Sequence, residues 1–224
     1  MTESSRPHIA DVIDPGDALG EVLFGLIMAL TFTVGSRLVF TEEGLNVREL
    51  IVATIGCNVA WGIIDAVLFV LGTVFYKSRR VRLFRQIKAA KSEQEAISAL
   101  RREFPIDGEP LVSAGADEEA LYQAMLGFAR RGSPAKLRLS RDDLLAAFIV
   151  FLLVSATSLP AVIPFFMIDS ANLALRTSNF LLIALLFTTG CAWARFSDAK
   201  PLNAGITMTC LGLALVGIAV ALGG

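Results

Sequence analysis

An aspartate lies near the middle of a long apolar stretch of the sequence, residues 49–75. Asn58, Trp61 and Asp65 are spaced i, i+3 and i+7 in this stretch, so on a helix their side chains share one face. A carboxylate in the hydrocarbon layer of a membrane costs at least about 2.5 kcal/mol and usually faces a bundle interior or a water-filled path. One interpretation is that this face lines a cation or proton path. The alternative is a hydrogen-bonded contact that fixes helix packing.

A second set of polar residues lies near the middle of the third apolar stretch. Ser155, Thr157 and Ser158 are followed there by Pro160 and Pro164. Each proline lacks a backbone donor and frees a carbonyl one turn earlier, so both are predicted to kink the helix. Freed carbonyls and hydroxyls can bind cations or water where they line a cavity. The alternative is a kink that serves packing alone.

Two further candidates lie in the first apolar stretch. Glu21 begins it, and Met28 follows on the same helical face. Glu21 lies near the predicted membrane boundary, where an acid costs little. We therefore expect Glu21 to act as an interfacial anchor or gate residue rather than as a deep ligand.

The composition indicates a membrane protein. The 224 residues are 54% hydrophobic, with a mean hydropathy of +0.64, well above that of a soluble domain. Five apolar stretches are long enough to cross a hydrocarbon core of about 30 Å: residues 20–40, 50–75, 143–168, 174–195 and 203–223. The predicted fold is an all-α integral membrane protein with five transmembrane helices.

Basic residues directly after the second stretch predict the topology. They are Lys77, Arg79, Arg80, Arg82, Arg85, Lys88 and Lys91. The positive-inside rule places this segment in the cytoplasm. We expect a multi-pass protein of the plasma (inner) membrane, with a cytoplasmic N-terminus and the C-terminus outside. The basic cluster is expected to contact the anionic lipid of the bilayer rather than nucleic acid.

The predicted organisation has four parts. Residues 1–19 form a cytoplasmic tail, 20–75 the first two transmembrane helices, 76–142 a cytoplasmic helical hairpin, and 143–223 the last three transmembrane helices. The hairpin prediction rests on apolar residues at helical spacing on both sides of the sequence PIDGEP, which breaks the pattern.

Known enzyme motifs are missing from the sequence. It contains no GxSxG, Walker A or HExxH sequence, and its only histidine is His8. The three cysteines form no CxxC pair, which argues against a zinc site or a disulfide framework. We therefore predict that the protein is not an enzyme and has no cofactor.

Several segments resemble the vacuolar iron transporter family. SLPAVIPFF (158–166) is similar to the proline-containing stretch of the family's third span, and ARFSDAKPLNAG (194–205) to its turn before the fifth span. IGCNVAWGIIDAVLF (55–69) is similar to its second span, with Asp65 near the position of a family glutamate. The resemblance implies five spans, a cytoplasmic helical insert, a homodimer, and transport of a divalent cation such as iron or manganese in exchange for protons.

Three family motifs are missing from this sequence. The first span has no aspartate in LFGLIMALTF (23–32), and the second has no methionine beside its acid. The insert lacks the ExxE spacing, which leaves four glutamates as weak metal-binding candidates: Glu93, Glu95, Glu118 and Glu119. The leading hypothesis is a divergent metal cation/proton antiporter that depends on Asp65. The alternative is a transport-silent membrane protein of the same fold with a structural or regulatory role.

Overall fold

The computed structural model describes residues 13–39, 46–105, 116–133 and 138–223. Every regular element in these residues is a helix. The chain divides into two compact units, one formed by Met1–Val70 with Arg141–Gly224 and the other by Leu71–Ser140. Most of the predicted N-terminal tail, including His8, lies outside the described residues.

Five helical segments are long and apolar enough to cross a membrane: Pro15–Ser36, Val47–Ala89, Arg141–Met167, Ala171–Phe196 and Pro201–Ala221. They correspond to helices α2 (Pro15–Val39), α3 (Val47–Ala89), α6 (Arg141–Ala156) with α7 (Ser158–Met167), α8 (Ala171–Trp193) with the short 3₁₀ helix η1 (Ala194–Phe196), and α9 (Pro201–Ala221). The predictions of an all-helical chain and of five long apolar helices are confirmed for the described residues.

Helix α2 begins at Pro15, earlier than the predicted start at residue 20. Asp14 caps it, because its Oδ1 accepts hydrogen bonds from the backbone N–H groups of Gly16 at 2.7 Å and of Asp17 at 3.4 Å. Pro15 occupies the first helical position, where no backbone donor is needed. The capping residues, rather than the start of the apolar stretch, determine where the helix begins.

Helix α3 continues to Ala89, although its apolar stretch was predicted to end at residue 75. The sequence from Tyr76 to Ala89 contains neither glycine nor proline, and it is rich in arginine and lysine, which favour helix. Leu83 and Ile87 are buried in the core of the second unit. The change from apolar to basic residues therefore does not end the helix.

The third apolar segment is interrupted at Thr157, between α6 and α7. Pro160 cannot donate a hydrogen bond to the carbonyl of Ala156 four residues earlier, and its ring would clash with that group in a continuous helix. A side-chain hydroxyl provides a hydrogen bond near the interruption: Thr157 Oγ1 donates to the Val154 carbonyl at 2.6 Å. Pro164 lies inside α7.

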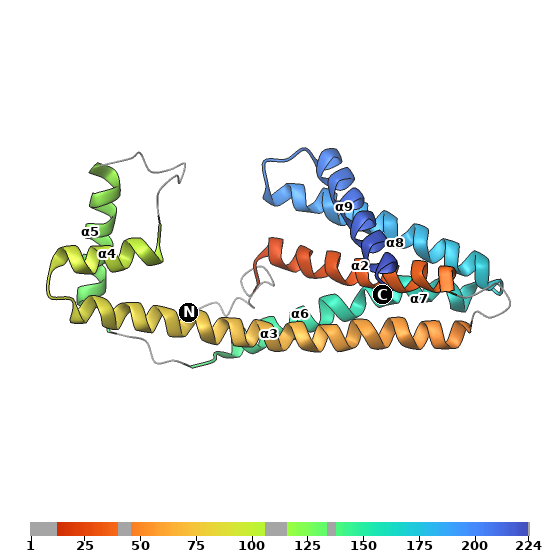
Figure 1. The fold of residues 1–224 in the computed structure, drawn as a ribbon, viewed down its shortest axis with the longest axis horizontal. Coiled ribbons are helices and arrows are strands. Elements are labelled where there is room, and N and C mark those ends of the chain that lie inside the picture. Colours follow the sequence, from red (N-terminus) through yellow and green to blue (C-terminus); the bar gives the residue numbers. More distant parts are fainter. Residues whose placement is uncertain (1–12, 40–45, 106–115, 134–137, 224) are drawn as a thin grey trace, which may run out of the picture. The chain divides into compact units, whose positions relative to one another are not determined.

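Helix α2 is the central helix of the first unit, because it contacts α6, α7, α8 and α9 (Figure 1). Its apolar face packs in a core with residues of α7, α8 and α9: Leu23, Leu26, Ala29, Leu30, Ala161, Leu182, Leu186 and Val216. This arrangement holds α2 in a fixed position, with Glu21 on a turn adjacent to the core.

In the second unit, α4 (Glu93–Glu103) and α5 (Ala116–Arg131) pack together with the C-terminal part of α3. Ser92 caps α4 by accepting a hydrogen bond from the Glu95 N–H at 3.2 Å. Tyr122 is fully buried in the core, and its hydroxyl donates to the Phe104 carbonyl at 2.8 Å.

Candidate functional site

Asn58 connects three of the membrane helices. It is fully buried on α3, and its Nδ2 donates to the Gly25 carbonyl of α2 at 3.1 Å. The same atom lies 3.3 Å from the Val154 carbonyl and 2.9 Å from Thr157 Oγ1, at the interruption between α6 and α7. Each net hydrogen bond contributes roughly 1 kcal/mol, and a buried group left unpaired costs more. This junction therefore holds α2, α3 and α6 together in the conformation that the structure shows.

Two glycines allow the helices to approach one another at this level. A Cβ atom on Gly25 would collide with Thr157 Oγ1 and lie 2.9 Å from the Val154 carbonyl. A Cβ atom on Gly62 would lie 2.8 Å from Ser155 Oγ and 2.9 Å from a backbone carbonyl of α6. Side chains larger than hydrogen do not fit at either position, so both contacts bring α6 directly against a neighbouring backbone.

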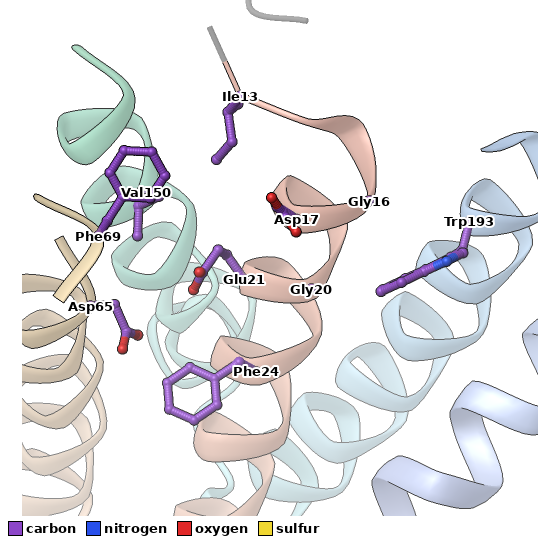
Figure 2. Close-up of a pocket in the computed structure, with 10 residues that line it drawn as sticks. All are labelled: Ile13, Gly16, Asp17, Gly20, Glu21, Phe24, Asp65, Phe69, Val150 and Trp193. Atoms are coloured by element: carbon purple, nitrogen blue, oxygen red, sulfur yellow. The ribbon is translucent and has the colours of Figure 1, made fainter. Parts of the chain in front are cut away.

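Glu21 and Asp65 line the same cavity, although they belong to different helices. The cavity has a volume of about 540 Å³ and is lined by Ile13, Gly16, Asp17, Gly20, Glu21, Phe24, Asp65, Phe69, Val150 and Trp193. Figure 2 shows the carboxyl groups of Glu21 and Asp65 directed toward the space between α2 and α3. Asp17 lies one turn before Glu21 on α2 and adds a third acid to the lining.

No basic side chain in the described part of the chain forms an ion pair with Glu21 or Asp65. Asp65 Oδ2 is buried and has no hydrogen-bond partner among the described residues. Two like charges in an environment of low dielectric repel one another, and a positive charge between them is stabilised. The cavity therefore has the charge and the oxygen ligands that suit a passing cation.

Unpaired polar atoms continue from this cavity along the contact between α3 and α6. Like Asp65 Oδ2, Ser155 Oγ and Asn58 Oδ1 are buried and have no hydrogen-bond partner in the part of the chain that the structure describes. Ser155 Oγ lies against Gly62, which stands between Asn58 and Asp65 on one face of α3. Buried polar groups are normally hydrogen-bonded, so three exceptions where α3 meets α6 mark this row as polar and able to accept water or a cation. We call Asp65, Ser155 and Asn58 the polar row.

The remaining candidates of the membrane helices lie around these features. The Trp61 side chain is 41% exposed and packs edge-to-face on Phe24, with ring centroids 5.7 Å apart. Met28 is half-buried one turn beyond Phe24 and does not line the cavity. Ser158 is buried, and its hydroxyl donates to the Ser155 carbonyl at 2.6 Å. Neither Met28 nor Ser158 contributes an unpaired atom to the polar row.

The four glutamates considered as weak metal candidates already have partners in the second unit. Glu118 and Glu119 approach Arg101, at 3.2 and 3.4 Å, and Glu93 approaches an arginine of α5 at 3.7 Å. Glu95 accepts a hydrogen bond from a backbone N–H at 2.9 Å. Across the described ranges, no three His, Cys, Asp or Glu side chains are placed so that they could hold a metal ion.

The sequence interpretation missed several cavity residues. Asp17 and Phe69 could have been found, because each lies four residues from a candidate acid and so shares its helical face. Gly62 lies outside the cavity but contacts Ser155, and it too could have been found, because it lies four residues after Asn58. Trp193 has no such signal, since its place in the lining depends on the packing of α8 beside α2.

The comparisons with known proteins agree with the resemblance seen in the sequence. The model of the VIT family matches residues 76–224, which is more than half of the chain. No curated protein matches the sequence. Members of the VIT family are membrane transporters, and the family indicates transport of metal ions. The match, together with the five long apolar helices, shows that this chain belongs to the VIT family.

Proposed function

We propose that this protein moves a divalent metal cation across the membrane in exchange for protons, with Glu21 and Asp65 as the carboxylates that bind both. One observation carries the proposal. Two acids on separate helices face a single cavity, and neither has a basic partner among the described residues. A structural acid in a membrane helix usually pairs with a basic group or a backbone donor.

The ligand chemistry favours a cation such as Fe²⁺ or Mn²⁺. The acidic cavity offers carboxylate oxygens, and the polar row adds a hydroxyl and an amide oxygen. Oxygen ligands suit Mn²⁺ and Mg²⁺, and carboxylates also occur in Fe²⁺ sites. Two facing carboxylates form an incomplete ligand set, which suits an ion that passes through and retains part of its water.

The proposed route of the cation follows the polar row. From the cavity, the row leads past Ser155 to Asn58 at the junction of the three helices. The tight contacts at Gly25 and Gly62 close the route at this level. We infer that movement of α6 against α2 and α3 opens the route during transport, and that Thr157 at the helix interruption permits this movement.

The membrane arrangement is part of the proposal. We infer a plasma (inner) membrane protein with a cytoplasmic N-terminus, a cytoplasmic insert at residues 76–142, and a C-terminus on the outer side. The basic residues after the second span support this orientation. We also infer a homodimer. The most apolar part of α3 supports this, because almost none of it is buried by the described residues of the same chain.

Transport can be tested with the purified chain in proteoliposomes that carry a pH gradient. We expect uptake of Fe²⁺ or Mn²⁺ with a linked movement of protons, and loss of most uptake in Asp65→Asn. Glu49→Gln is the matched control, because Glu49 also lies on α3 but is hydrogen-bonded to Asn46 at 2.7 Å, outside the cavity.

Two results would contradict the proposal. The first is wild-type protein that is folded and reconstituted but moves neither cation, which would favour a structural or regulatory role. The second is unchanged uptake in Asp65→Asn. The melting temperature of each variant in detergent shows whether a loss of uptake reflects unfolding.

A further inference from the structure

A second cavity lies in the unit 71–140 and has a different chemical character from the first. It has a volume of about 220 Å³ and is lined by Arg79, Arg82, Leu83, Gln86, Ala99, Arg102 and Glu103. The lining contains three arginines, one glutamine and a single acid, so it carries a net positive charge. We call this cavity the arginine groove.

The one acid of the arginine groove is already paired. Arg79 and Glu103 form an ion pair at 2.9 Å that joins α3 to α4. Arg82 has no partner among the described residues, and Arg102 only donates to the Ser98 carbonyl of its own helix at 3.3 Å. Two guanidinium groups therefore remain to receive an anion. Guanidinium groups bind phosphate well because their donors form a planar fork.

The position of the groove along α3 indicates where the anion comes from. Arg79 lies four residues after Phe75, which is about 6 Å at the rise of an α-helix. The headgroup layer of a bilayer begins directly outside the hydrocarbon core and is several ångströms thick. Since the apolar stretch of α3 ends near Phe75, Arg79 falls at the depth of the lipid headgroups. Arg82 lies one turn further out, about 10 Å beyond Phe75, where its long side chain can reach back to a lipid phosphate.

One face of α3 continues from the apolar stretch into the groove. Leu71, Phe75, Arg79, Arg82 and Gln86 are spaced by four, four, three and four residues, which keeps them on one side of the helix. Leu71 and Phe75 are 58% and 62% exposed, so their apolar surfaces are uncovered. The face therefore offers an apolar surface for acyl chains beside a basic groove for a headgroup.

We propose that the arginine groove binds the phosphate headgroup of an anionic phospholipid whose acyl chains lie along Leu71 and Phe75. This site is separate from the acidic cavity and goes beyond the proposed transport activity. A lipid bound there would anchor the end of α3, and the helices that pack on it, to the membrane surface.

The test uses the full chain in neutral detergent, with lipid adducts counted by native mass spectrometry. Phosphatidylglycerol and phosphatidylcholine are added separately at equal concentration. We expect at least fivefold more phosphatidylglycerol adduct than phosphatidylcholine adduct. In the double variant Arg82→Gln/Arg102→Gln the two lipids should bind equally. Both arginines are exposed, so the melting temperature without lipid should not change.

The matched control is Arg80→Gln/Arg85→Gln, which removes the same charge at positions that do not line the groove. This control should retain the preference for phosphatidylglycerol, because binding in the groove depends on the residues that line it. A non-specific attraction of anionic lipid to basic residues would be lost equally in both variants. Glu103→Gln should increase phosphatidylglycerol binding, since it releases Arg79. Equal loss in the control, or weaker binding in Glu103→Gln, would overturn the site. Displacement of the lipid by millimolar inorganic phosphate would show a site for soluble phosphate instead.

Discussion

Thr157 Oγ1 packs directly against the backbone of Gly25, so the interruption between α6 and α7 touches the main chain of the central helix α2. The same hydroxyl accepts a hydrogen bond from Asn58 at 2.9 Å and donates one to the Val154 carbonyl at 2.6 Å. One hydroxyl thus links the interrupted helix to both neighbouring helices. The contact joins the proposed moving part, α6, to the fixed part of the bundle.

Gly25→Ala is expected to destabilise the protein, because the added methyl group collides with Thr157 Oγ1 and the Val154 carbonyl. Overpacking of this kind typically costs about 1–3 kcal/mol. Gly56→Ala is the control, since a Cβ at Gly56 meets nothing within 4 Å and alanine favours helix. Melting in detergent should show a drop of several degrees for Gly25→Ala and none for Gly56→Ala. Equal melting temperatures would mean that the helices do not approach this closely.

Asn58→Leu should lower stability by about 1–3 kcal/mol, because it removes a buried donor that lies within hydrogen-bond distance of three acceptors outside α3. The same substitution at Asn179 is a matched control. The Oδ1 atom of Asn179 is buried without a partner, so its replacement by an apolar side chain leaves no hydrogen bond broken there. Chemical or thermal unfolding in detergent compares the two. A smaller loss at Asn58 than at Asn179 would contradict the role of the junction.

The apolar stretches predicted the existence of the five long helices but not their ends. Hydropathy reports where a chain prefers lipid, whereas a helix ends where its caps and breakers are. Helix α2 begins at Pro15, after the Asp14 cap and before its apolar stretch. Helix α3 continues through the basic residues after Tyr76, well beyond the end of its apolar stretch. Both differences could be recognised from capping and propensity rules.

The candidate site was predictable only in part. Helical spacing placed Asn58 and Asp65 on one face of α3, and the structure shows Gly62 between them as the contact for Ser155. Spacing within one helix does not report which residues of another helix lie opposite. Glu21 was therefore interpreted as an interfacial anchor or gate residue, and its place in the same cavity as Asp65 was not predicted. That pairing depends on how α2 and α3 pack.

The insert is expected to contribute little to metal binding. A full-length variant with Glu93, Glu95, Glu118 and Glu119 all replaced by glutamine should bind Mn²⁺ with unchanged affinity in calorimetry. The replaced ion pairs are on the surface and contribute at most about 1 kcal/mol each, so the fold should be retained. A tenfold or larger loss of affinity would show that these glutamates form a metal site, for example between two copies of the chain.

Cysteine labelling can test the proposed topology. Gln94→Cys and Ser170→Cys are suitable, because both residues are exposed and the Ser170 side chain makes no capping hydrogen bond. The native Cys57, Cys191 and Cys210 are first replaced. A membrane-impermeant maleimide added to intact cells should label position 170 and leave position 94 unlabelled until the cells are opened. The reverse pattern would invert the orientation.

A double-mutant cycle tests whether Glu21 and Asp65 bind the same ion. Glu21→Gln and Asp65→Asn should each reduce cation uptake by at least about tenfold, which corresponds to roughly 1.4 kcal/mol. If the two carboxylates act on one cation, the double variant should lose little more than either single variant, because residues that share a partner are not additive. Asp198→Asn with Asp65→Asn is the control cycle, since Asp198 is exposed in the loop before α9 and does not line the cavity. In the control pair, the fold reduction in uptake of the double variant should equal the product of the two single reductions. The same result for Glu21 and Asp65 would show that the two acids have independent roles. In that case Glu21 is a boundary residue, as its position in the sequence first indicated, and Asp65 acts without it.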